Sequence, residues 1–192
     1  NYLWSTETSG FLITNNTDGI TDAGQPTFNS NGVTIAGDQS GYGWSVRDQN
    51  QISWNFRAAP GFFDVQTWTG TGSEVTVSHD LTSTPAVIIA KNLDSTGNWY
   101  VYHKDANSDA SGSYIVLNTD DPAGASSREL WTPTSTTFNA ATYLDLSTNN
   151  QNYIAYLFAD TPGVIKCGKY TGTNSTQNIL TGFKPEWVLI KN

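Results

Sequence analysis

An internal repeat with a period of about one hundred residues limits how this sequence can fold. Residues 52–61 (ISWNFRAAPG) match residues 154–163 (IAYLFADTPG), 102 positions later. At the same spacing, residues 68–71 match residues 170–173. Self-similarity at a fixed period is the signature of a chain built from repeated supersecondary units. We therefore expect this chain to be built from repeated units of about 100 residues, with one or two compact cores.

The phase of the repeat predicts the domain organisation. After a two-residue deletion, the match resumes with residue 85 against residue 185. Residues 60–161 then form one complete unit, residues 1–59 the rear part of a preceding unit, and residues 162–192 the front part of a following unit. Because an incomplete unit exposes unpaired strand edges, we expect the two end pieces to complement each other, within one chain or between neighbouring chains.

Short segments of alternating or β-branched and aromatic residues, separated by Gly, Pro, Asn, Asp and Ser, predict strands joined by turns. The expected strands are residues 51–57, 62–69, 74–78, 86–91, 99–103, 114–118, 142–146, 153–158, 164–170 and 187–191. No stretch shows the 3.6-residue apolar period of an amphipathic helix. The predicted fold class is all-β, with tandem antiparallel β-sandwich (jelly-roll or lectin-like) repeats of about 100 residues.

Composition excludes several classes of function. The formal net charge is -8, and the nine Lys and Arg residues form no basic run, so no nucleic-acid partner is expected. Apolar runs such as residues 153–159 are too short to cross a bilayer, so no membrane insertion is expected. Cys167 is the only cysteine, which rules out a disulfide within the chain. With no methionine and no leader pattern, the sequence is expected to be a processed chain or an excerpt.

Catalytic and cofactor motifs are also missing. Hydrolysis of a glycosidic bond needs two facing carboxylates, and no strand carries acidic residues at alternate positions of one face, although an undetected pair stays open. His79 and His103 are expected to be polar strand-end residues, because no nucleophile elbow accompanies them. The glycine-rich turn at residues 69–72 lacks the helix and lysine of a phosphate-binding loop. We expect no enzyme and no cofactor.

One loop resembles a calcium site in part. Asp105, Asn107 and Asp109 place oxygen ligands at alternate positions, as a calcium-binding loop does. Ala110 and Val116 stand where such a loop carries its glycine and its final acid. The pattern favours a solvated loop, with weak calcium binding left open and no metal site assigned.

Aromatic side chains are the remaining candidates for ligand contact, because sugar rings stack on exposed Trp and Tyr. Most of the aromatic residues are expected in the core. The candidates for a glycan-binding platform are Trp99, Tyr102, Trp44 and Trp131.

Several segments resemble a family of tandem β-repeat proteins encoded by marine bacteriophages, including cyanophages. The resembling segments are residues 53–65 (SWNFRAAPGFFDV), 78–81, 95–103 (STGNWYVYH), 153–159 (YIAYLFA), 165–172 (IKCGKYTG) and 183–191 (FKPEWVLIK). The resemblance implies a virion protein, such as a tail fibre or another surface appendage, located on the extracellular particle. It implies no catalytic or binding residues.

The leading hypothesis from the sequence is a non-enzymatic phage virion structural protein, a rigid repeat spacer that also attaches to glycans on the host surface. Its expected partners are neighbouring copies or repeats, other virion proteins and host surface glycans. The alternative is a carbohydrate-binding module of a larger secreted glycan-acting protein, with exposed aromatic residues as its platform.

Overall fold

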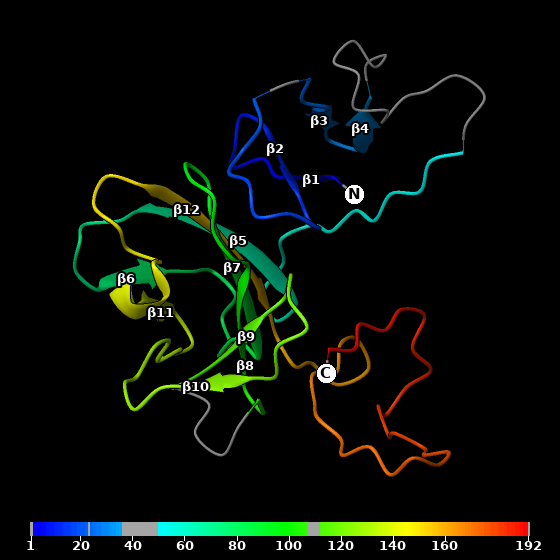
Figure 1. Ribbon diagram of the computed structural model, residues 1–192. Coiled ribbons are helices and arrows are strands. Elements are labelled where there is room, and N and C mark those ends of the chain that lie inside the picture. Colours follow the sequence, from blue (N-terminus) through cyan, green and yellow to red (C-terminus); the bar gives the residue numbers. More distant parts are fainter. Residues whose placement is uncertain (1, 23, 36–49, 107–111, 192) are drawn as a thin grey trace.

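The computed structural model describes residues 2–22, 24–35, 50–106 and 112–191, and it is almost entirely β (Figure 1). Its strands form several antiparallel sheets, and the described residues contain one short 3₁₀ helix, η1 (Thr142–Leu144). The all-β class predicted from the sequence is confirmed. None of the helical structure in the described residues is long enough to cross a bilayer.

A six-stranded antiparallel sheet forms the centre of the molecule. Its strands, in spatial order, are β10 (Gly124–Ala125), β9 (Ser113–Val116), β8 (Tyr100–His103), β7 (Val87–Asn92), β12 (Asn152–Phe158) and β5 (Phe63–Thr69). β12 pairs along its whole length, with Ile154 opposite Thr67 on one side and Lys91 on the other. The strand predicted at residues 153–158 therefore lies between two others, as its nearly continuous apolar sequence requires.

A second layer covers one face of this sheet. It is the two-stranded sheet of β6 (Val75–Ser78) and β11 (Thr137–Ala140), and an apolar core fills the space between the layers. In that core Trp68 stacks on Tyr153, with ring centroids 5.3 Å apart, and meets Phe138 edge to face at 5.7 Å. The arrangement is sandwich-like, with β12 contributing every second side chain to the core.

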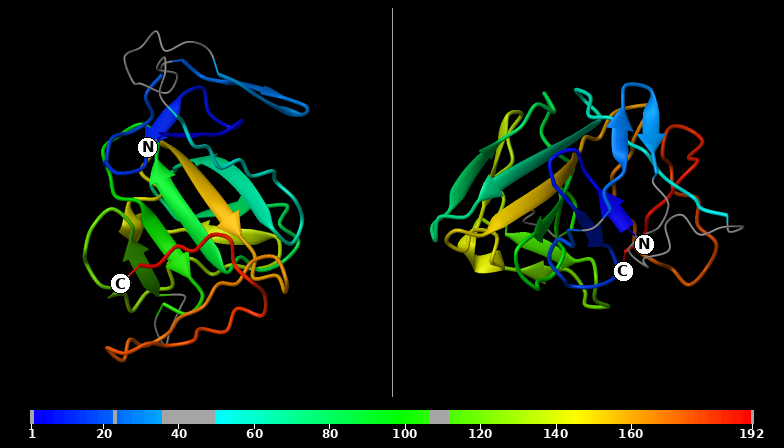
Figure 2. Two further views of the ribbon diagram at one scale, coloured as in Figure 1. Left: turned by 90° about the vertical axis from the view of Figure 1, so that its right-hand side faces the viewer. Right: turned by 90° about the horizontal axis from the view of Figure 1, so that it is seen from above.

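The opposite face of the sheet packs against the N-terminal residues. There β1 (Tyr2–Trp4) and β2 (Phe11–Ile13) form a hairpin, and Leu12 joins Trp99 and Ile154 in a second apolar cluster. A separate hairpin pairs β3 (Thr27–Asn29) with β4 (Gly32–Thr34). Figure 2 shows these N-terminal strands and the C-terminal residues on the same side of the main body.

Strands β5 to β12 run from Phe63 to Phe158, within the unit predicted at residues 60–161. The division into units stays a prediction. Residues 142–146 were expected to form a strand, and this expectation is wrong: they contain η1, after which Asp145 takes a left-handed backbone (φ 51°) that no strand continues.

Three other expected strands, at residues 51–57, 164–170 and 187–191, are not formed. Each of these segments has strand-like composition, but of their described residues only Ile165 forms a β-bridge, an isolated one with Thr161, and a strand needs continuous pairing with a neighbour. In Figure 1 the C-terminal residues trace an extended path beside the main body.

Candidate functional site

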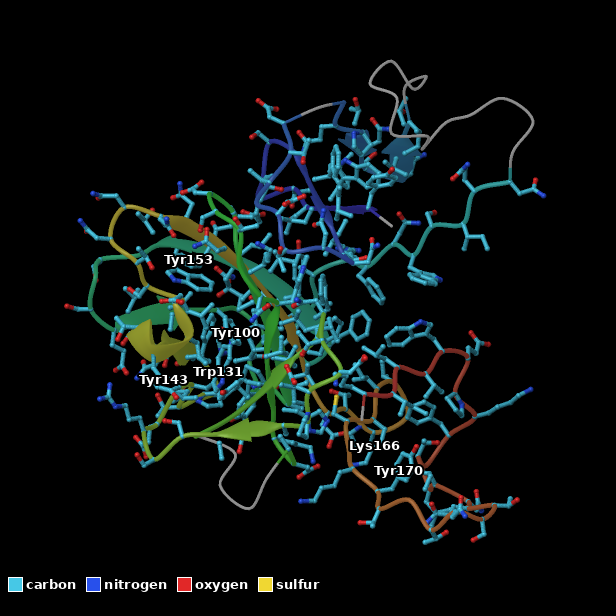
Figure 3. All side chains as sticks on the ribbon, viewed as in Figure 1. Tyr100, Trp131, Tyr143, Tyr153, Lys166 and Tyr170 are labelled. Atoms are coloured by element: carbon cyan, nitrogen blue, oxygen red, sulfur yellow. The ribbon has the colours of Figure 1, made fainter. Side chains whose placement is uncertain are left out.

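Three of the four residues predicted to form a glycan platform are buried. Trp99, Trp131 and Tyr102 are 2%, 0% and 6% exposed, so their rings offer no face to a sugar, which corrects the expectation for these three residues. Trp44 lies outside the described residues. Figure 3 shows Trp131 within the main body.

Burial of these rings has a clear structural reason. The indole nitrogen of Trp131 donates to the carbonyl oxygen of Ser113 at 3.1 Å, and that of Trp99 donates to the carbonyl oxygen of Asn16 at 3.1 Å. Each tryptophan thus ties the central sheet to a distant segment while its polar atom remains satisfied. They are anchors of the two cores.

The candidate calcium loop lies mostly outside the described residues, which include Asp105 but not Asn107 or Asp109. The Asp105 carboxylate is paired with the ammonium of Lys104 at 2.6 Å. No group of three or more His, Cys, Asp or Glu side chains that could hold a metal ion occurs in the part of the chain that the structure describes.

The remaining reactive side chains have structural surroundings. His79 is buried, and its Nδ1 accepts a hydrogen bond from the backbone N–H of Leu81 at 3.3 Å, as expected for a polar strand-end residue. Cys167 is buried against the carbonyl oxygen of Ala159 at 3.7 Å. Burial raises the pKa of the Cys167 thiol to about 11, so the thiol is protonated at neutral pH.

A polar cleft lies at the end of the sandwich where β7 ends and β8 and β12 begin. Its volume is about 480 Å³, within the range of ligand pockets. The half-buried ring of Tyr100 lines it, together with the buried Leu144 and Leu146. The rest of the lining is polar: Thr17, Asn92, Ser95, Thr96, Gly97, Asn98, Asp145, Thr148 and Gln151.

Sequence reasoning did not find this cleft. Its walls come from the 92–98 loop and from the 144–151 segment, which was expected to begin as a strand. The turn at Asp145 is what brings Leu144, Asp145 and Leu146 to the opening. Alternation of apolar and polar residues predicts extended backbone, and it does not indicate that a residue other than glycine, such as Asp145, adopts a left-handed conformation.

A second surface feature is a concentration of exposed apolar side chains in the unpaired segments. Ile52 and Trp54 are 87% and 73% exposed, and Leu180 is 81% exposed. The others in these segments are Phe56, Val164, Tyr170, Ile179, Trp187, Val188, Leu189 and Ile190. Monomeric proteins rarely leave so many large apolar side chains exposed to water.

Residues 6–192 match the family described as "Domain of unknown function (DUF7483)", and the chain belongs to this family. The chain matches no curated protein and no solved structure.

Proposed function

We propose that this member of the family is a non-enzymatic structural module of a bacteriophage virion appendage, such as a tail fibre, in which sandwich units of about 100 residues repeat in tandem. One observation carries the proposal: the turns of residues 59–92 recur in residues 161–191 at the spacing of the sequence repeat. The virion location is supported by the resemblance to phage-encoded repeat proteins.

The first recurring turn is formed at residues 59–63 and again at residues 161–165, which match in the repeat. An isolated bridge joins Ala59 to Phe63, and another joins Thr161 to Ile165. The backbone N–H of Ala59 donates to the carbonyl oxygen of Phe63 at 2.8 Å, and that of Thr161 donates to the carbonyl oxygen of Ile165 at 3.0 Å. The same turn is therefore made twice, 102 residues apart.

Left-handed backbone positions recur as well. They are Gly61 and Gly163, Gly72 and Asn174, and Thr82 and Gly182. The first two pairs are separated by 102 residues and the third by 100, as the two-residue deletion requires. Because φ > 0 is uncommon outside glycine, the agreement at three turns supports a common ancestral unit.

The repeat also assigns partners to the unpaired segments. Within the complete unit, Tyr156 of β12 stands opposite Val65 of β5 and Ile89 of β7. Carried over by the repeat, Trp54 pairs with Cys167 on one side and Leu189 on the other. Residues 50–56 then form the central strand of a second sheet, and the exposed apolar side chains become its core.

Pairing within one chain is favoured over pairing between chains. The two turns touch, because the Thr161 hydroxyl donates a hydrogen bond to the carbonyl oxygen of Gly61. The rings of Trp54 and Trp187 already lie 6.5 Å apart between centroids. Segments tethered this closely meet at effective concentrations on the order of millimolar, so a second chain at micromolar concentration cannot compete.

Such a module works through its geometry. Repetition sets the reach of the appendage, and pairing of the two end pieces leaves fewer unpaired strand edges exposed. The net charge of -8 favours solubility of the module and limits its non-specific association.

A disulfide test probes the second sheet. Trp54→Cys places a thiol opposite Cys167, the only native cysteine, and oxidation with diamide should give a monomer with an internal disulfide. Asn55→Cys is the matched control, because its side chain points to the other face of the strand. Non-reducing electrophoresis and intact mass would read the outcome. Disulfide-linked dimers, or equal cross-linking of both variants, would refute pairing within the chain.

Peptide mapping of purified phage particles tests the virion assignment. The expected result is peptides from this sequence in the particle fraction, within a chain heavier than 20.9 kDa. A chain of 20.9 kDa found only outside particles would overturn the virion assignment.

A second candidate function, a carbohydrate-binding module of a larger secreted glycan-acting protein, is favoured by the polar cleft at Tyr100. The same cleft would serve the virion module as a contact with host glycans.

A further inference from the structure

We propose that the cleft lined by Tyr100, Asp145 and Gln151 binds a neutral sugar. The inference rests on the glycan-attachment part of the proposed function and names a site for it. It replaces the buried platform with side chains that a ligand can reach.

The cleft offers the apolar surface that a sugar ring needs. Tyr100 is half-buried, and its ring meets Tyr114 edge to face at 5.9 Å, which holds it in place. Leu144 and Leu146 are buried beside it. Of these three side chains, the partly exposed ring of Tyr100 is the one that can cover the C–H face of a sugar, and it does so at little entropic cost because the ring is already fixed.

Uncommitted polar groups complement this surface. The side-chain oxygen of Asn98 accepts from Asn118 at 3.0 Å, and that of Gln151 accepts from Asn92 at 2.5 Å. Their NH₂ groups make no hydrogen bond within the described part of the chain, nor does the exposed carboxylate of Asp145. Two donors and a strong acceptor are thus left for ligand hydroxyl groups.

The loops that carry these groups are held by their own hydrogen bonds. The side-chain oxygen of Asn92 accepts the backbone N–H groups of Asp94 and Ser95, at 2.9 and 3.0 Å. The backbone N–H of Gly97 donates to the carbonyl oxygen of Thr17 at 2.8 Å, and that of Asp145 donates to the carbonyl oxygen of Thr142 at 3.0 Å. A ligand would therefore order little of the protein on binding.

The charge of the lining selects against anions. Among the described residues that line it, Asp145 is the only charged one, and none is a Lys, Arg or His that could neutralise a ligand carboxylate or phosphate. A phosphorylated or acidic sugar would place like charges together, whereas a neutral sugar could donate hydroxyl protons to the carboxylate.

NMR titration of the full chain with methyl glycosides of glucose, galactose, mannose and N-acetylglucosamine tests the inference. At tens of millimolar, at least one should shift the amide signals of Tyr100 and Gln151, while glucuronate should not. Asp145→Asn preserves the side-chain shape and tolerates the left-handed backbone. It should weaken neutral-sugar binding roughly tenfold and allow glucuronate to bind.

Asp120→Asn, which removes an exposed carboxylate outside the cleft, is the matched control and should bind like the wild type. Absence of shifts with all four glycosides would overturn the inference, as would equal binding by both variants. The particle mapping is independent of this outcome, so a failed titration with the chain present in virions rejects only the sugar site.

Discussion

Replacement of Lys91 by methionine should remove a pH dependence of stability that this buried lysine creates. Lys91 is 0% exposed in β7, opposite Ile154. Its ammonium donates to the carbonyl oxygens of Asn92 at 2.7 Å and Ser95 at 3.4 Å. Burial lowers its pKa from 10.5 to about 8, with the nearby Asp18 acting in the opposite direction.

The direction and size of the effect follow from linkage. Because the folded protein releases the Lys91 proton near pH 8 and the unfolded chain only near pH 10.5, the unfolded chain binds more protons between these values. The Lys91 contribution to the free energy of unfolding therefore rises with pH over this window. The gap from about 8 to 10.5, at roughly 1.4 kcal/mol for each pH unit, amounts to about 3 kcal/mol.

Urea unfolding between about pH 7 and pH 11 would measure this contribution. Burial also raises the pKa of Tyr156, Tyr102 and Cys167, which lowers stability at high pH, but these groups are present in both proteins and cancel in the difference. The free energy of unfolding of the wild type, relative to that of Lys91→Met, should increase by about 3 kcal/mol as the pH rises from about 8 to 10.5. The exposed Lys184→Met is the control and should keep the wild-type profile. If the difference in unfolding free energy between wild type and Lys91→Met does not change with pH, Lys91 is not the source of this pH dependence.

Three further substitutions test the fold. Trp131→Ala should cost about 3–5 kcal/mol in thermal or urea unfolding, as expected for a fully buried anchor; a loss below 1 kcal/mol would contradict its place in the core. Asp64→Ala should cost about 2–3 kcal/mol, because the buried carboxylate accepts from Val65, Gln66 and Asp80; an unchanged urea midpoint would count against these bonds. Thr82→Gly should stabilise the protein by up to about 1 kcal/mol by relieving a positive φ, and a lower melting temperature would show that Thr82 carries no strain there.

Lys91 and its equivalent in the sequence repeat differ in how deeply they are buried. Its repeat equivalent, Lys191, is only half-buried and donates to the carbonyl oxygen of Asp121 at 3.0 Å. The same residue type thus has different surroundings in the paired and unpaired copies of the strand. Closure of the proposed second sheet would bury Lys191 in the same way.

Local sequence signals are sufficient to predict the all-β class and most strands of the central sheet. Period-two alternation and turn residues are local signals, and they located β5 to β9 and β12 to within a few residues. They also predicted strands at residues 51–57 and 187–191, which the structure leaves unpaired, because pairing depends on a partner and not on composition.

Which aromatic side chains a ligand can reach depends on the packing of distant segments in the folded chain. Trp99 and Tyr100 are neighbours in the chain, yet one is buried beneath the N-terminal hairpin and the other lines the cleft. Exposure depends on which distant segment covers each face of a sheet, and neither the β1–β2 hairpin nor the turn at Asp145 is encoded near these residues. The repeat can be recognised from the sequence alone. The cleft cannot, because its walls come from segments that are distant in the chain and meet only after folding.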